Sequence, residues 1–170
     1  RKVAIQGVAG CFHDVAARAY FPGEELEIVP CSTFREEFAA IKKDYSIVGM
    51  VAIENTIAGS LLPNHNLLKD SDLRIMGEIK LRIEHSLVAW PGQQLSDLTE
   101  VHSHPMALMQ CEEFLSAYPR LKAVESDDTA GSARWIAEEH IVGSAAICGT
   151  LAAEIYGLEV LFSGIETNKH

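Results

Sequence analysis

Residues Val51–Leu62 read V-A-I-E-N-T-I-A-G-S-L-L, and this stretch indicates the class of fold. An apolar run over 47–53 stops at Glu54-Asn55-Thr56, and the small residues Ala58-Gly59-Ser60 follow. A buried strand that ends in a carboxylate, an amide and a hydroxyl is typical of ligand sites in open α/β sheets. Small residues let backbone N–H groups approach a ligand closely, which suits an oxyanion. The alternative is a polar turn and a helix cap without a ligand.

The same order of apolar run, polar or small-residue turn and helical segment occurs at three further places. Four such junctions in one chain predict repeated βα units with a turn at the carboxyl end of each strand. The three runs are Val3–Gln6 before Gly7–Gly10, Val101–Ser103 before His104-Pro105, and Ala123–Ser126 before Asp127–Ser132.

The alternation of strand and helix signals predicts an α/β fold with mainly parallel sheets. The second helix is the best marked, because Thr33 and Glu36 form a capping box. An apolar stripe follows at helical spacing, at Phe34, Phe38 and Ile41. Helices are expected over 11–20, 33–44, 105–118, 129–140 and 150–156, with a short one ending near 70, and strands over 2–7, 26–30, 47–53, 99–102, 121–125, 144–148 and 159–163.

Residues 74–90 alternate apolar and charged side chains and then become continuously apolar. This is too long for an ordinary strand of about 5–6 residues, so we expect a strand that leaves one sheet and enters another. The chain is therefore predicted to form two lobes, residues 1–80 with 150–170 and residues 81–149. Two crossovers would join them, near Leu81–His85 and near Cys148–Thr150.

Composition narrows the possible partners. The formal charge of −10 argues against nucleic acid or an anionic membrane, because both bind basic faces. Apolar runs are about strand length, so no transmembrane helix is expected. The four cysteines are scattered without a C-x-x-C spacing, which favours reduced thiols in a cytoplasmic protein over disulfides or zinc.

Taken in order, the motifs resemble the catalytic domain of prephenate dehydratase. Each motif is weak alone, but their order and spacing hold from residue 1 to about residue 168. The matching pieces are Ala4-Ile5-Gln6-Gly7, Gly10-Cys11-Phe12-His13, Glu54–Ser60, His104–Leu108, Gln110-Cys111, Asp128–Ala133, Ala145-Ala146-Ile147 and Tyr156-Gly157-Leu158.

The chain departs from the family pattern in three ways. Thr56 stands where a serine is common, which keeps the hydroxyl. Met106 stands where a glutamine is common, and Gln110 one helical turn further on could supply the lost amide. The family continues past a segment like Ile165–His170 into a threonine-arginine-phenylalanine motif tied to catalysis, which the given chain does not reach. A regulatory domain is expected beyond it.

The resemblance implies two α/β lobes like those of periplasmic binding proteins, and a carbon–oxygen lyase of phenylalanine biosynthesis. This enzyme would convert prephenate to phenylpyruvate, carbon dioxide and water without a cofactor, as a cytoplasmic homodimer. The alternatives are an arogenate dehydratase, or a non-catalytic two-lobed sensor of a small carboxylate.

Candidate site residues fall into two groups. Asn55 and Thr56 can donate to a dicarboxylate without a charge penalty, whereas Glu54 suits a hydroxyl-binding or indirect role. At the second group, Thr129 would donate from a helix amino terminus and Asp128 would cap that helix. The resemblance adds Ala58, Gly59, Ser60, His104, Gln110, Ala130 and Gly131 as substrate-binding residues.

We expect the two groups to face each other across a cleft between the lobes, with the substrate bridging them. His102, His104 and Cys111 could be imagined as metal ligands, but no acidic neighbour or third histidine supports a metal site. His13, His85 and His140 are interpreted as surface or structural residues. Nucleotide and serine-hydrolase motifs are absent from the sequence.

Overall fold

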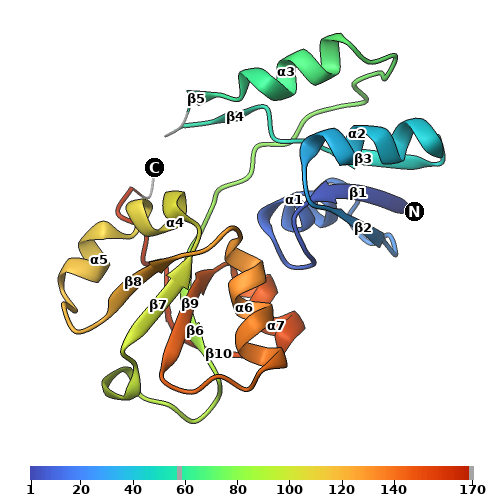
Figure 1. The fold of residues 1–170 in the computed structure, drawn as a ribbon. Helices are drawn as coiled ribbons and strands as arrows, with labels where there is room; N and C mark the ends of the chain where they lie inside the picture. Colours follow the sequence, from blue (N-terminus) through green and yellow to red (C-terminus); the bar gives the residue numbers. More distant parts are fainter. Residues whose placement is uncertain (57–58, 169–170) are drawn as a thin grey trace. The chain divides into compact units, whose positions relative to one another are not determined.

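The computed structural model describes residues 1–56 and 59–168, and the chain divides into two units. The first comprises Arg1–Val8 and Phe12–Leu81, and the second comprises Ala9–Cys11 and Arg82–His170. Figure 1 labels the helices and strands of each. The prediction of a two-lobed α/β fold with mainly parallel sheets is confirmed.

The first unit is built on a three-stranded parallel sheet in the order β2-β1-β3. Its central strand is fully buried at Val3, Ala4 and Ile5, so both faces are covered, because strand side chains alternate. Helices α1 and α2 pack against it. The predicted cap of α2 is confirmed, since the Thr33 hydroxyl accepts from Glu36 N at 3.1 Å. The elements are β1 (Lys2–Gln6), α1 (Phe12–Tyr20), β2 (Glu27–Cys31), α2 (Phe34–Lys43) and β3 (Ile47–Met50).

Strand β3 ends at Met50, three residues earlier than the sequence indicated. Met50 pairs with Ile5 and β1 ends one residue later, so the ladder stops there. Residues 51–53 leave the sheet and lead into an antiparallel hairpin and a helix. These are β4 (Glu54–Asn55), β5 (Gly59–Ser60) and α3 (Leu62–Lys69).

The second unit contains a mixed five-stranded sheet in the order β10-β6-β9-β7-β8. Strands β9, β7 and β8 run parallel, β6 pairs antiparallel with β9, and β10 pairs antiparallel with β6. Every residue of β6 and β9 is buried, and Figure 1 shows α4 and α5 on one face of the sheet and α6 and α7 on the other. The elements are β6 (Ser86–Ala89), η1 (Leu95–Asp97), β7 (Glu100–Ser103), α4 (Pro105–Gln110), α5 (Glu112–Ser116), β8 (Lys122–Glu125), α6 (Thr129–Glu138), β9 (Ser144–Cys148), α7 (Thr150–Tyr156) and β10 (Glu159–Ser163).

The last segment lies in the second unit, whereas the sequence placed residues 150–170 in the first lobe. Helix α7 follows β9 directly and packs on α6, and β10 then pairs antiparallel with β6. Residues 148–150 are therefore not a crossover between lobes. Besides the short segment Ala9–Cys11, which belongs to the second unit, the chain passes from the first unit to the second between Leu81 and Arg82, inside the other predicted crossover.

The alternating segment before β6 is not a strand. Residues 72–85 carry no helix or strand assignment, and pairing begins only at Ser86. Gly77 in this segment leaves room for the side chain of Tyr20, because a Cβ at Gly77 would overlap the Tyr20 hydroxyl. The period-2 pattern therefore marks an extended connection without the strand partners that it was expected to have.

The helix predicted over 105–118 is divided at Cys111, whose φ of −106° and ψ of 20° break the helical run. A residue distant in sequence binds both sides of the break. Thr167 N donates to Gln110 O at 2.8 Å, and the Thr167 hydroxyl accepts from Glu113 N at 3.4 Å. Tertiary hydrogen bonds thus replace those that a continuous helix would make.

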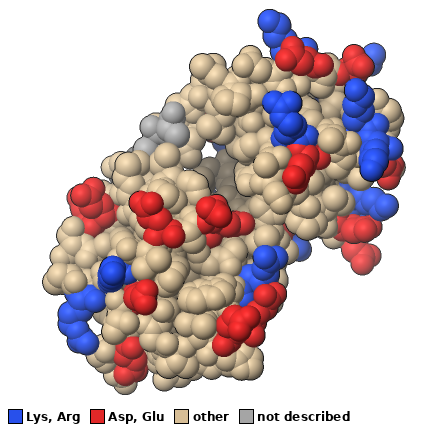
Figure 2. Space-filling model, viewed as in Figure 1, with Lys and Arg blue, Asp and Glu red and all other residues tan. Residues whose placement is uncertain are grey.

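The distribution of surface charge and the state of the cysteines are consistent with what the composition indicated. Figure 2 shows acidic and basic side chains interspersed over the face in view. All four cysteines are buried free thiols, as predicted. None of the helices in the described ranges is long and apolar enough to cross a membrane.

Candidate functional site

The first group of predicted residues lies together in the β4–β5 hairpin. Glu54 pairs with Ser60 and Asn55 with Gly59. Gly59 has a φ of 77°, a left-handed conformation that favours glycine. At the base of the hairpin, Leu61 N donates to Ile53 O at 2.8 Å. The hairpin therefore presents a carboxylate, an amide and two hydroxyls from one short segment.

The position of this group differs in one respect from the sequence prediction. Three residues separate it from the end of β3, so it does not follow the buried strand directly. Glu54, Thr56 and Ser60 are exposed and Asn55 is partly buried, which leaves polar groups where a ligand could contact them. Ala58 lies outside the described residues.

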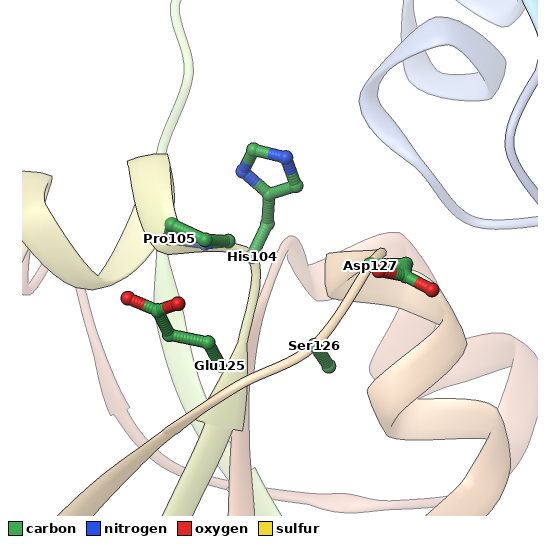
Figure 3. Close-up of a pocket in the computed structure, with 5 residues that line it drawn as sticks. All are labelled: His104, Pro105, Glu125, Ser126 and Asp127. Carbon is green, nitrogen blue, oxygen red and sulfur yellow. The ribbon is translucent and has the colours of Figure 1, made fainter.

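His104 lies in the second unit, where β7 meets α4. It caps α4, because its Nδ1 accepts from Met106 N at 3.1 Å. A neutral ring that accepts at Nδ1 carries its hydrogen on Nε2, so Nε2 is the atom that can donate to a ligand. The ring stands at the edge of an open hollow of about 340 Å³ (Figure 3). The hollow is lined by His104, Pro105, Glu125, Ser126 and Asp127.

Two carboxylates border the hollow without converging. In Figure 3 the Glu125 carboxylate points toward Pro105, and the Asp127 carboxylate points away from it. Both side chains belong to exposed residues. Their charge disfavours a substrate carboxylate at this place and would favour a cationic group.

The amino terminus of α6 begins just beyond the hollow. Asp128 is its N-cap, as predicted, and accepts from Ala130 N at 3.0 Å. The Ala130 amide is therefore engaged by the cap. Gly131 is explained by packing, because a Cβ there would lie 3.0 Å from Asp128 Cβ. Thr129 is the first helical residue and is 9% exposed.

Gln110 lies at the opposite end of α4 from His104 and is held by a residue that the sequence did not single out. The Nε2 atom of buried His85 lies 2.6 Å from Gln110 Oε1, so the imidazole N–H donates to the amide oxygen. Burial lowers the pKa of His85, which favours the neutral ring. Engagement of Oε1 leaves the amide NH₂ as the end of Gln110 that can donate elsewhere.

Glu166 is a further buried polar residue near this pair, and its carboxylate accepts from His85 N at 3.4 Å. In the sequence, Glu166 was marked only as a charged residue within a segment that resembles one in the family. His85 gave no signal, because a single histidine at the start of an apolar strand is usually structural.

The predicted site residues thus form two groups. The hairpin residues belong to the first unit, and His104, Gln110 and Thr129–Gly131 belong to the second. The arrangement in which one substrate bridges them stays a prediction.

His102, considered as a metal ligand with His104, has a different environment. Its Nε2 lies 3.4 Å from Glu100, and its ring packs against Trp135 with centroids 4.8 Å apart. Within residues 1–56 and 59–168, no three histidine, cysteine or acidic side chains are grouped as a metal ion would require.

Comparison with known proteins identifies similar sequences and structures. The family model described as prephenate dehydratase matches residues 3–170. Arogenate dehydratase 3, chloroplastic, from Arabidopsis thaliana is 40% identical over 97% of the chain. A bifunctional N-acyl-homoserine lactone acylase/prephenate dehydratase from Komagataeibacter europaeus is 36% identical over the whole chain. The crystal structure of prephenate dehydratase in complex with L-Phe from Arthrobacter aurescens superposes with a TM-score of 0.88 at 28% identity, over 99% of this chain and 57% of that one.

The chain spans only part of these relatives, 39% of the Arabidopsis protein and 59% of the Komagataeibacter protein. The match nevertheless extends over nearly all of this chain and includes the hairpin, the His104 turn and the start of α6. The chain belongs to the prephenate dehydratase family.

Proposed function

We propose that this chain is the catalytic domain of a prephenate dehydratase. The observation that carries the proposal is the family match over residues 3–170, which includes both groups of candidate site residues. The relatives whose names contain prephenate or arogenate dehydratase support the same class of reaction.

The reaction needs no covalent enzyme intermediate. The bond between the ring and its carboxylate breaks and releases carbon dioxide. Its electron pair moves into the ring, and the ring hydroxyl departs and takes a proton to leave as water. Because aromatisation drives these steps, the protein has to hold the substrate, donate hydrogen bonds to the departing oxygen and exclude water.

We assign the holding role to neutral donors. Asn55 and Thr56 would donate to substrate oxygens, with Gly59 and Ser60 shaping the same hairpin. Thr129 would donate from the first turn of α6, where the partial positive charge of a helix amino terminus favours a carboxylate. Glu54 would accept from a substrate hydroxyl, because an ionised glutamate repels a carboxylate.

The test is turnover of prephenate by the intact natural protein, followed by phenylpyruvate absorbance. We expect Thr129→Val to lower kcat/KM at least about tenfold, since a hydrogen bond to a charged group contributes about 1.5–3 kcal/mol. Thr150→Val is the matched control, because Thr150 is the first residue of the neighbouring helix α7 and is exposed.

Two results would contradict the proposal. Binding of prephenate without phenylpyruvate formation would point to a carboxylate sensor. Equal kinetics and equal melting temperatures for Thr129→Val and the parent would show that Thr129 is structural and that the carboxylate binds elsewhere.

Arogenate is the second candidate substrate. It carries an amine where prephenate carries a ketone, and the acidic edge of the hollow at Glu125 and Asp127 would favour that cation. Three relatives at 39–40% identity bear the name arogenate dehydratase alone. Measuring kcat/KM for both compounds with one preparation distinguishes them, and a ratio above one for arogenate would assign it as the substrate.

We further infer a cytoplasmic homodimer in which a regulatory domain accompanies this domain. The buried free thiols support a reducing compartment, and relatives longer than this chain support additional domains. The Arabidopsis relative is named chloroplastic, so cell fractionation is the appropriate test of location. Light scattering on the natural protein tests the dimer.

A further inference from the structure

The segment that precedes the hairpin is held by side chains where the sheet no longer holds it. Strand β3 ends at Met50, and both backbone polar groups of Ala52 are bound by side chains. His13 Nε2 accepts from Ala52 N at 3.3 Å, and Asn64 Nδ2 donates to Ala52 O at 2.7 Å. Together, His13 and Asn64 form what we call the Ala52 clamp.

His13 is suited to this role by its surroundings. It lies on α1, and its ring packs edge-on against Phe34 with centroids 5.3 Å apart. Withdrawal from water lowers the pKa of His13 to about 4. The ring is therefore neutral near pH 7, so Nε2 can accept from Ala52 N while Nδ1 carries the hydrogen.

Asn64 is the only residue of α3 that is buried, at 3% exposed, whereas its neighbours His65 and Asn66 are exposed. A buried amide costs free energy unless it is hydrogen-bonded, and its bond to Ala52 O meets that requirement. The side chain thus connects the helix that follows the hairpin to the segment that precedes it.

The clamp lies immediately before the candidate site residues. Ala52 is two residues before Glu54, and the next residue, Ile53, accepts from Leu61 N at 2.8 Å to close the hairpin. Two helices of the first unit therefore hold the base of a hairpin that has left its sheet. We infer that His13 and Asn64 are positioning residues that place Glu54-Asn55-Thr56, and the effect on catalysis rests on the proposed function.

The inference is tested with His13→Leu and Asn64→Ala in the intact natural protein. His65→Leu and Asn66→Ala are matched controls, because they make the same changes at exposed positions one or two residues along α3. His13→Gln is the conservative variant, since the glutamine oxygen can accept from Ala52 N in place of Nε2. Each variant is measured for amide resonances of Ala52, Asn55 and Thr56 and for kcat and KM with prephenate.

We expect the Asn55 and Thr56 resonances to shift in His13→Leu and Asn64→Ala and to stay near the parent values in both controls. We expect kcat to fall roughly tenfold or more, because small displacements of a positioning group cost about that much or more. His13→Gln should recover most of kcat and the parent resonances.

The two proposals fail in different ways. Unchanged Asn55 and Thr56 resonances in His13→Leu and Asn64→Ala would overturn the positioning inference, whether or not the parent turns over prephenate. A parent protein without turnover, but with those resonances displaced in the variants, would overturn the proposed function and leave the positioning inference supported. Should His13→Leu fail to fold, Asn64→Ala still provides both readouts against its control Asn66→Ala.

Discussion

Glu37 is a fully buried acid in the first unit, and Glu37→Gln should change how stability depends on pH. Its carboxyl oxygens make no hydrogen bond of good geometry with any described residue. A Cβ at Gly49 would lie 3.1 Å from Oε1, so the glycine leaves room for this carboxyl group. Burial raises the pKa of Glu37 to about 9, and the Met50 backbone offsets part of that rise.

The direction of this pH dependence follows from the protonation state of Glu37 in the folded chain and in the unfolded chain. Between pH 4.5 and about 9 the folded chain keeps Glu37 neutral, whereas the unfolded chain ionises it. Unfolding then releases a proton, so the free energy of unfolding falls as pH rises through this window. At pH 7 the difference from the unfolded pKa is about 2.5 pH units, which corresponds to about 3 kcal/mol.

We expect Glu37→Gln to be more stable than the parent by about 3 kcal/mol at pH 7 and to match it near pH 4.5. The assay is urea unfolding followed by the methyl resonances of Val3 and Ile5, which are buried in the first unit. Both tryptophans, Trp90 and Trp135, lie in the second unit, so their fluorescence is an internal control.

Glu27→Gln serves as the control variant, because Glu27 is exposed in the same unit. It should leave the pH dependence of the parent unchanged. A parent protein whose first unit is equally stable at pH 5 and pH 8 would refute the reasoning, since Glu37 would then be ionised in the fold.

Two further predictions concern the second unit. Gly10→Ala should lower the stability of this unit by roughly 2 kcal/mol, measured by tryptophan fluorescence in urea. The reason is that Gly10 has a φ of 89° and that the new Cβ would lie 2.8 Å from Ala152 Cα. A change below about 0.5 kcal/mol would contradict the packing argument. Burial raises the pKa values of Cys111 and Cys148 to about 12, so both thiols should react with a disulfide reagent at pH 8 only after unfolding, and prompt reaction in the native protein would show that they are accessible.

The sequence was sufficient for elements whose signals are local. The capping residues and apolar stripe predicted α2 within one residue at each end, and Asp128 was identified as the cap of α6. Each of these features depends on side chains within one or two turns of the same helix. Local periodicity and capping chemistry record such features directly.

The predictions from the sequence were wrong where the structure depends on residues that are distant along the chain. Residues 74–85 alternate like a strand, but periodicity reports an extended backbone and says nothing about whether a neighbouring strand is present. The return of residues 150–170 to the first lobe was wrong for the same reason, because only the pairing of β10 with β6 shows where that strand lies. The break at Cys111 depends on Thr167, far along the chain.

The candidate site shows the same division. Glu54-Asn55-Thr56 could be selected from the sequence as a polar interruption after an apolar run. His13 and Asn64, which hold the preceding segment, could not, because a histidine on a helix and an asparagine in another carry no sign of a shared backbone partner.

The strand order of the two sheets has a consequence for the order in which the chain folds during synthesis. The first sheet pairs residues 2–6 with residues 27–31 and 47–50, so its ladders can form as soon as the amino-terminal segment has emerged. In the second sheet, Ser86 pairs with Cys148 and with Ser163, so β6 gains its second neighbour only with the last strand and has no neighbour at all until β9 is made. Its apolar residues are exposed until β9 has emerged. A nascent chain arrested between β6 and β9 should therefore contain a folded first unit and an incomplete second unit that is prone to aggregate.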